Sequence, residues 1–142
     1  MKNLLLPIDG DAGRTKAAVA EALSMYAQEP VRIHLLNVQP VVSSHVAMFF
    51  GDGELQQTQL NAGAEDLAPA RAQLDAAGLA YTTTVKIGRS AETIARVARE
   101  LGCDRIVMGR EDPGFANKIF GSLAHQVRHL LSGAGDCQVI GS

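Results

Sequence analysis

The sequence predicts an open α/β fold of Rossmann-like type, a five-stranded parallel sheet with helices on both faces. Five short apolar runs are spread along the 142 residues. Between them lie stretches in which apolar side chains recur every three or four positions, as in a helix with one buried side. Strands that alternate with helices pair in parallel through right-handed crossovers, so this alternation limits the possible topologies. The length suits one domain, which we expect over residues 1–142.

The first three elements are predicted from the pattern of apolar residues. Residues 3–8 are an apolar run, which predicts a buried strand. Residues 14–27 predict a helix, because apolar side chains recur at helical spacing: Val19, Leu23 and Tyr26. Residues 31–38 predict the second strand. Residues 39–53 then predict a long irregular connection, of a length more typical of a functional segment than of a simple turn.

The middle of the chain predicts a helix, a strand and a second helix. Residues 54–77 predict a helix that Pro69 kinks or splits, with one apolar side made by Leu60, Ala64, Leu67 and Leu74. Residues 79–87 are rich in β-branched side chains and predict the third strand. Ser90 is a candidate cap for the next helix, whose apolar side is Ile94, Val97, Ala98 and Leu101.

The last third predicts two more strands around one helix. Residues 104–109 predict the fourth strand. The final helix is expected from its apolar positions: Leu123, Val127, Leu130 and Leu131. Residues 132–136 read as a linker, and residues 137–142 predict a short final strand.

Composition excludes several classes of function. Aromatic residues make up 4% of the chain and Trp is absent, which disfavours a nucleic-acid surface built on stacked aromatics. The net charge of -2 contains no block of like charge that would attract nucleic acid or an anionic membrane. No apolar run approaches the ~18 residues of a membrane span, so we expect a cytoplasmic protein.

Metal and catalytic motifs are also missing from the sequence. Cys103 and Cys137 form no CxxC pair, and we expect two buried free thiols. His125 and His129 have the spacing of a metalloprotease motif, but Gln126 stands where that motif needs Glu, so we expect a solvated helix face and no metal. His34 is expected to be a satisfied strand residue. No nucleophile-base arrangement is recognisable, and we expect no catalytic residues.

The candidate site lies where strands end. In open α/β sheets, ligands bind beyond the carboxyl ends of the strands, where the strand order reverses. Both common orders of five strands place the first strand at that reversal. Pro7 and Asp9 leave the first strand, and Met108 and Gly109 leave the fourth. Asp9 could accept hydrogen bonds from a ribose or an adenine amine, or it could instead cap the following helix or its turn.

A second candidate stretch runs from residue 108 to 122. Its glycines allow backbone N–H groups to approach an anion, and Gly121-Ser122 precede a helix whose N-terminus favours negative charge. The plainer alternative is that Ser122 is an ordinary N-cap and that Gly114 belongs to a turn after Pro113.

Over essentially its whole length the chain resembles the universal stress protein family. The matching residues are LLLPIDGDAGRTKAAVAEAL (4–23), HLLNVQP (34–40), VKIGRSAETIARVARELGCDRIVMGR (85–110) and GSLAHQV (121–127). The resemblance implies a sheet in the order 3-2-1-4-5, a homodimer and, in some members, ATP or another adenine nucleotide as ligand. It implies nucleotide-binding positions at Pro7, Asp9, Val38, Met108, Gly109, Gly114, Gly121 and Ser122.

The sequence departs from the family pattern in the phosphate loop and at the C-terminus. The family loop reads G-x2-G-x9-G-[ST], but Asp112 replaces its second glycine, and the span from Gly109 to Gly121 is one residue shorter. Glu111 adds a further negative charge, roughly offset by Arg110 and Lys118. Gln138 replaces a proline, and Gly141 weakens the final strand, which in the family often pairs two subunits.

These features lead to three hypotheses of different class. The first is a non-enzymatic stress-response protein of the cytoplasm that binds adenine nucleotide weakly. The second is an interaction protein of the same fold with an empty pocket. The third, an ATPase or adenylate-handling enzyme, is the least favoured, because Asp9, Glu111 and Asp112 are the only carboxylates available near the phosphates.

Overall fold

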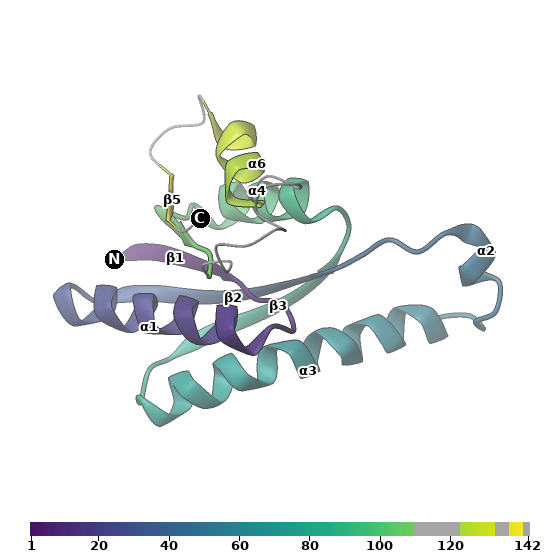
Figure 1. Cartoon of the computed structure of the whole chain (residues 1–142), viewed down its shortest axis with the longest axis horizontal. Helices are drawn as coiled ribbons and strands as arrows, with labels where there is room; N and C mark the ends of the chain where they lie inside the picture. The colour runs from purple at the N-terminus through teal and green to yellow at the C-terminus, as the bar shows by residue number, and fades with distance from the viewer. Residues whose placement is uncertain (110–122, 133–136, 141–142) are drawn as a thin grey trace.

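The computed structural model describes residues 1–109, 123–132 and 137–140. Its centre is a five-stranded sheet in the order β3-β2-β1-β4-β5, with every neighbouring pair parallel (Figure 1). The strands are β1 (Lys2–Pro7), β2 (Val31–Gln39), β3 (Tyr81–Ile87), β4 (Arg105–Val107) and β5 (Gln138–Ile140). The predicted fold class, the strand order and the central place of the first strand are therefore confirmed.

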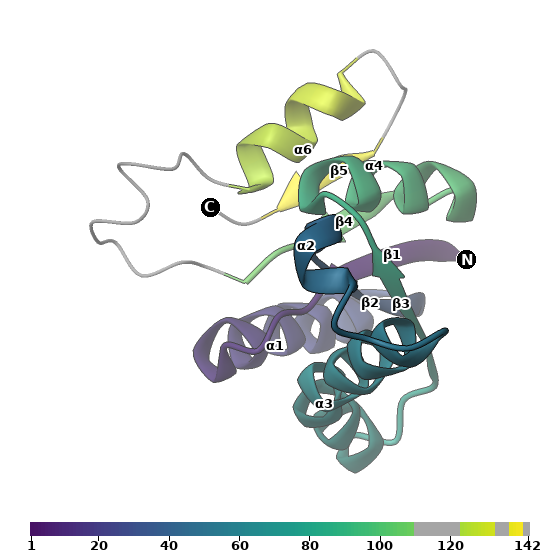
Figure 2. The ribbon, with the colours of Figure 1, turned by 90° about the vertical axis from the view of Figure 1, so that its right-hand side faces the viewer.

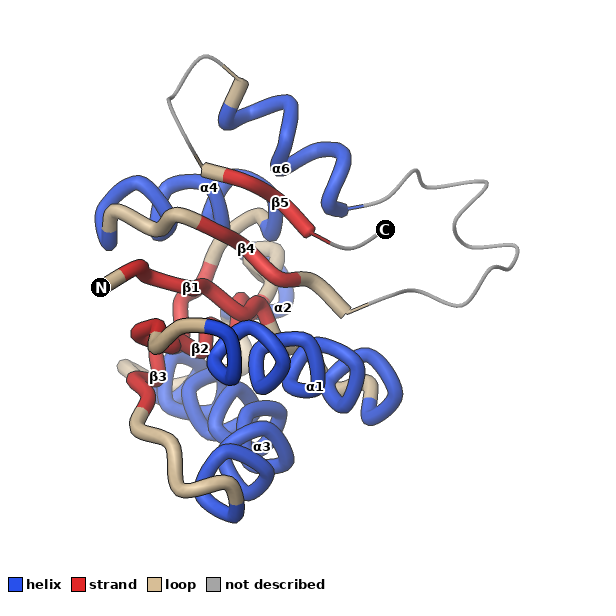
Figure 3. Tube along the Cα trace, turned by 90° about the vertical axis from the view of Figure 1, so that its left-hand side faces the viewer, coloured by secondary structure: helices blue, strands red, loops and turns tan. Residues whose placement is uncertain are grey.

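Helices cover both faces of the sheet. Helices α1 (Ala12–Gln28) and α3 (Glu54–Ala76) lie on one face, and α4 (Ser90–Leu101) and α6 (Leu123–Leu131) lie on the other. End views from opposite sides show the strands between these two layers (Figures 2 and 3). Among the described residues no helix is long and apolar enough to cross a membrane.

Strand β1 is shared by two separate hydrophobic cores. Leu4 and Leu6 pack on the face covered by α1 and α3, whereas Leu5 packs on the face covered by α4 and α6. All three side chains are at most 1% exposed. Successive side chains of a strand point to opposite faces, so an unbroken apolar run is what a strand buried on both faces requires.

Helix α3 is not split at Pro69, and its buried side differs in part from the predicted one. It runs without a break through Pro69, which is exposed, while Leu67, Ala70 and Leu74 around it are buried. Packing of these side chains outweighs the hydrogen bond that the proline ring removes. The predicted apolar side is confirmed at Leu67 and Leu74, which are buried, but it is wrong at Ala64, which is exposed. The buried side also includes Gln59 and Gly63.

Other elements differ at their edges. The expected irregular connection contains a short helix, α2 (Ser44–Ala47), whose N-cap Ser43 accepts a hydrogen bond from the Val46 amide at 3.2 Å. Ser90 is the first residue of α4 and not its cap, because Arg89 holds the cap position. Three side chains predicted on buried helix sides are more than a third exposed: Tyr26, Leu101 and Leu130.

The strands are also shorter or displaced relative to the prediction. β1 covers residues 2–7 and not 3–8, β3 begins at Tyr81 and not at residue 79, and β4 ends at Val107, so Met108 and Gly109 follow the strand. Residues 141–142 of the predicted last strand, including Gly141, lie outside the described residues.

Candidate functional site

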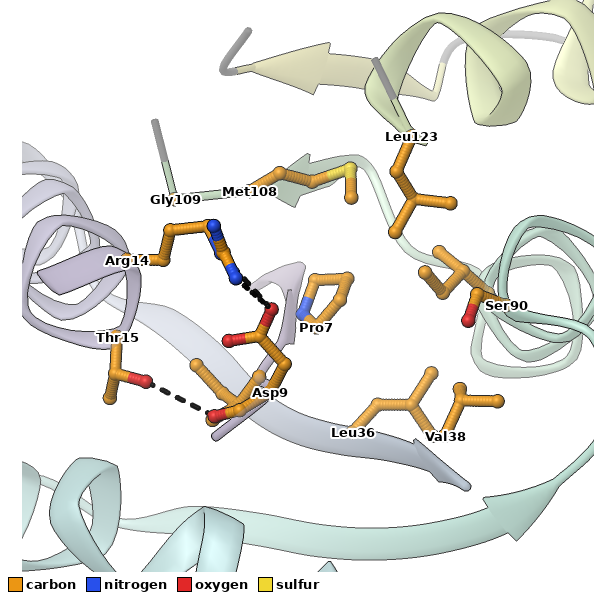
Figure 4. Close-up of a pocket in the computed structure, with 12 residues that line it drawn as sticks. Pro7, Asp9, Arg14, Thr15, Leu36, Val38, Ser90, Met108, Gly109 and Leu123 are labelled. Carbon is orange, nitrogen blue, oxygen red and sulfur yellow. Dashed lines mark hydrogen bonds and ion pairs between the residues drawn. The ribbon is translucent and has the colours of Figure 1, made fainter. Parts of the chain in front are cut away.

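A hollow lies at the carboxyl ends of the central strands, where the strand order reverses. It is bounded by the ends of β1, β2 and β4 and by the first turns of α1, α4 and α6. Its twelve lining residues are Pro7, Ile8, Asp9, Arg14, Thr15, Leu36, Val38, Ser90, Ile94, Met108, Gly109 and Leu123 (Figure 4). The position is the one that the strand-end rule predicts.

Five of the eight predicted site residues line this single hollow: Pro7, Asp9, Val38, Met108 and Gly109. They lie at or just after the ends of β1, β2 and β4, which are distant in sequence, and the sheet brings these ends together. The remaining three predicted residues, Gly114, Gly121 and Ser122, lie outside the described residues. So do the charged residues of the predicted phosphate loop: Arg110, Glu111, Asp112 and Lys118.

Asp9 is held in a turn at the start of α1. Its Oδ1 accepts a hydrogen bond from the Asp11 amide at 2.9 Å, and its backbone carbonyl accepts one from the Thr15 hydroxyl at 3.4 Å. Asp11 is the N-cap of α1, since its Oδ2 accepts the Arg14 amide at 2.8 Å. Asp9 therefore supports the turn, Asp11 caps the helix, and the Asp9 carboxylate still faces the hollow (Figure 4).

The second oxygen of Asp9 is taken by Arg14. Arg14 Nε donates to Asp9 Oδ2 at 3.0 Å, and the terminal Nη2 lies 3.0 Å from the same oxygen. The side chains of both partners remain substantially exposed, at 39% for Arg14 and 57% for Asp9. Ion pairs with this exposure contribute ~1 kcal/mol or less to stability, so a ligand could separate the two groups at low cost.

A buried amide fixes the strand exit that carries Asp9. Asn37, 2% exposed, donates from Nδ2 to the Ile8 carbonyl at 2.9 Å and to Asp66 Oδ2 of α3 at 3.1 Å. Gln39 Nε2 in turn donates to Asn37 Oδ1 at 2.7 Å. Because a buried amide without partners is costly, these bonds hold the ends of β1 and β2 in a defined position under α3.

Gly109 is in close contact with the backbone of α1. A Cβ atom built on it would lie 2.2 Å from the Arg14 carbonyl oxygen and 2.8 Å from the Arg14 Cα. No side chain fits at this distance, so glycine is required where the chain leaves β4 beside α1. This requirement is structural and does not depend on any bound phosphate.

The rest of the hollow is mostly apolar and small. Leu36, Val38 and Leu123 supply aliphatic surface across the hollow from Asp9 and Arg14 (Figure 4). Ile94 also lines the hollow. Its volume is about 90 Å³, against the ~300 Å³ or more of a typical small-molecule site. A nucleoside would therefore occupy it only if lining side chains moved or if part of the ligand remained outside.

Sequence reasoning missed several lining residues, and Arg14 is the most consequential. It is the only lysine or arginine among the described residues that line the hollow. Arg14 lies in the first turn of α1 and Asp9 precedes the helix, so no helical spacing in the sequence relates the two side chains. Ser90, predicted as a helix cap, lines the hollow and contributes a hydroxyl to its wall.

Other titratable groups lie away from this site. His34 is in contact with Thr82 and Asn3 at 2.6 and 3.2 Å, and burial lowers its pKa. The prediction of a satisfied strand histidine is therefore confirmed. Cys103 and Cys137 are free thiols, as predicted, but only Cys103 is buried, whereas Cys137 is partly exposed. Burial raises the pKa of Cys103 to about 12. Within the described ranges no three His, Cys, Asp or Glu side chains gather as a metal site.

Comparison with known proteins connects this geometry to a family. The model of the universal stress protein family matches residues 1–132. No curated protein matches the chain. A universal stress protein family structure from Burkholderia pseudomallei is similar at 23% identity and a TM-score of 0.68, covering 99% of this chain and 95% of the other.

Two further similar structures contain a nucleotide. One is a universal stress protein from Archaeoglobus fulgidus in complex with dAMP, at 15% identity, a TM-score of 0.59, and coverage of 99% of this chain and 97% of that one. The other is a universal stress protein family protein from Arabidopsis thaliana with AMP bound, at 15% identity, a TM-score of 0.63, and coverage of 99% and 90%. At these identities the likeness shows a shared fold.

Proposed function

Because this chain belongs to the universal stress protein family, we propose that it binds an adenine nucleotide weakly in the hollow between β1, β2 and β4, in a stress-response or regulatory role. The observation that carries the proposal is the convergence of Pro7, Asp9, Val38, Met108 and Gly109 on one hollow.

The chemistry of the hollow suits the nucleoside half of such a ligand. Its aliphatic wall would receive the adenine ring, and the Asp9 carboxylate could accept hydrogen bonds from ribose hydroxyls or the adenine amine. That related structures contain dAMP and AMP supports the same ligand class here.

We expect the second and third phosphates of the nucleotide to add little to the binding affinity. Asp112 stands where the family loop has glycine, and Glu111 adds a further negative charge. Two lost contributions of roughly 1.4 kcal/mol each would weaken ATP binding ~100-fold relative to an intact loop, and we expect an ATP dissociation constant of about tens of micromolar or weaker. ATP, ADP and AMP should therefore bind with similar affinity.

Calorimetric titration with adenosine, AMP, ADP and ATP tests the proposal. Val38→Phe places a larger side chain in the hollow and should abolish binding. Val41→Phe is the matched control, because Val41 is 69% exposed and lies outside the hollow. Circular dichroism and urea unfolding establish that both variants fold. The absence of binding by the parent chain at millimolar ligand would reject the proposal.

A second candidate function is an interaction protein of the same fold with no nucleotide. One observation favours it: both carboxylate oxygens of Asp9 already have partners, the Asp11 amide and the Arg14 side chain. The same titration separates the two candidates, since an interaction protein would show no saturable binding of any adenine compound.

Three further expectations belong to the proposal. We propose a non-enzymatic role, since no described group near the hollow is arranged as a nucleophile with its base. We also propose a cytoplasmic location and a homodimer, and a single domain over residues 1–142 stays a prediction.

A further inference from the structure

Arg14 introduces a charge that the nucleoside-binding chemistry does not use. The hollow contains a carboxylate, Asp9, which would repel a phosphate at close range. It also contains the Arg14 guanidinium, whose planar donors match phosphate oxygens. Adenosine, which has no phosphate, needs only the Asp9 carboxylate and the aliphatic wall. The presence of Arg14 therefore needs a separate explanation.

The position of Arg14 is suited to an anion at the mouth of the hollow. Figure 4 shows its side chain extending from α1 past Gly109, with the guanidinium between Gly109 and Asp9. A single oxygen, Asp9 Oδ2, accepts both Nε and Nη2 at 3.0 Å. The other carboxylate oxygen, Asp9 Oδ1, accepts a hydrogen bond from the Asp11 amide, and part of the Arg14 side chain remains exposed to solvent.

We propose that Arg14 is the residue that recognises the phosphate of a nucleoside monophosphate in this chain, exchanging its contact with Asp9 for one with the phosphate when the ligand binds. This inference rests on the proposed function and adds to it a residue that selects AMP over adenosine. Freed from Arg14, Asp9 Oδ2 becomes available to the ligand's hydroxyl or amine groups, so one exchange serves both ends of the ligand.

The exchange has a low cost because the resting pair is exposed. Ion pairs with this exposure are weak, so breaking this one reduces affinity by about fivefold or less. A guanidinium-phosphate contact in the partly enclosed hollow is stronger than that, because a dianionic phosphate presents more charge than one carboxylate. We expect a net preference for AMP over adenosine of about tenfold.

The test is the ratio of adenosine to AMP dissociation constants in four proteins. In the parent the ratio should be about ten, and in Arg14→Gln it should fall to about one, mainly through loss of AMP affinity. Arg14→Lys keeps the charge without the planar donors and should restore an intermediate ratio of about three. Arg96→Gln is the matched control: it removes an equally charged side chain that pairs with Glu100 on α4, outside the hollow.

The start of α1 should survive these substitutions, because its capping bond uses the Arg14 backbone amide and not the side chain. A second measurement observes the exchange directly. The Arg14 Nε–H resonance should shift when AMP is added and much less when adenosine is added.

Each outcome decides a separate claim. If the parent binds adenosine and AMP equally, Arg14 does not recognise phosphate, while the proposed nucleotide site stands. If Arg14→Gln weakens both ligands in the same proportion, Arg14 only supports the site, and the inference is overturned. If the parent binds neither compound, the proposed function fails and this inference fails with it.

Discussion

Substitution of Gly109 by alanine gives the sharpest test of the geometry that brings β4 beside α1. The new methyl group would lie 2.2 Å from the Arg14 carbonyl oxygen, 2.7 Å from its carbonyl carbon and 2.8 Å from its Cα. All three are backbone atoms of a helix whose buried side chains, including Ala18 and Val19, are fixed in the core. The clash cannot be relieved by rotating a side chain, so α1 or the β4 exit must move.

The expected cost follows from the usual range for overpacked sites. Adding a methylene where there is no room costs about 1–3 kcal/mol, and the backbone obstacle places Gly109→Ala at the upper end, about 3 kcal/mol. For a chain of this length that corresponds to a melting temperature lower by roughly 10 °C. Urea unfolding followed by circular dichroism measures the free energy directly.

Gly13, in the first turn of α1, provides a matched control. An added Cβ on Gly13 would meet only Asp11 Oδ2, at an ordinary 3.5 Å. Gly13→Ala should therefore stabilise the protein by roughly 0.5–1 kcal/mol, because alanine loses less entropy in a helix. If Gly109→Ala unfolds within ~0.5 kcal/mol of the parent, the β4 exit is free to move, and the structural reason given for this glycine is wrong.

Three other predictions concern the ligand, the assembly and the buried thiol. Asp9→Ala should weaken the binding of ATP, ADP and AMP by the same factor, and unequal losses in calorimetry would contradict this. Asp112→Gly should strengthen ATP binding selectively, because it removes a negative charge and supplies a less restricted backbone donor. An unchanged ATP affinity in that variant would contradict the expectation. Deletion of residues 137–142 should shift the proposed dimer towards monomer in sedimentation, and an intact dimer would show that the last strand is not the interface. Burial raises the pKa of Cys103 from 9.0 to about 12, so above pH 9 its thiol stays protonated in the folded chain and ionises in the unfolded chain. Its contribution to the free energy of unfolding should therefore fall by about 1.4 kcal/mol per pH unit between these values. Because the pKa of Cys137 is raised as well, Cys103→Ala should reduce the slope without abolishing it, and an equal slope in the variant would refute the assignment.

The sequence predicted the sheet well because its information is local and repeated. The run of Leu4, Leu5 and Leu6 is apolar at every position, which is the pattern of a central strand buried on both faces. The strand exits at Pro7 and Met108 could be placed from the same pattern. Their meeting in one hollow then follows from strand order, which the family resemblance supplied.

What the sequence did not predict depends on contacts between distant segments. The buried side of α3 includes Gly63, where an added Cβ would lie 2.5 Å from Val85 Cγ1 of β3. Close approach to the sheet therefore sets the rotation of this helix, and counting apolar residues could not detect it. Gln59 is buried because its Nε2 donates to the Pro40 carbonyl at 2.6 Å, a partner that no helical spacing reveals.

The alternatives left open for Asp9 show a related limit. The sequence offered a turn or a ligand contact, and the structure shows that one carboxylate can serve the turn through Oδ1 while its other oxygen faces the hollow. The Arg14 contact was missed because a pair five residues apart spans a strand exit, a turn and a helix start. No periodic pattern covers such a junction.

The central position of β1 also has a consequence for the order of folding. Its contacts with β2 close a short loop, as between Asn3 and His34, 31 residues apart, whereas its contact with the start of β4 joins Asn3 to Asp104 across 101 residues. Loop-closure entropy disfavours the longer closure by ~1 kcal/mol. We therefore expect β1, β2 and β3 to assemble first with α1 and α3. Afterwards β4 would pair with the free edge of β1, and α6 would pack with α4 on the face of the sheet that carries Leu5. In pulsed hydrogen exchange during refolding, amides of β2 would gain protection before those of β4, and simultaneous protection would exclude this order. Ligand binding would then wait for the last docking event, since the hollow needs the ends of both halves.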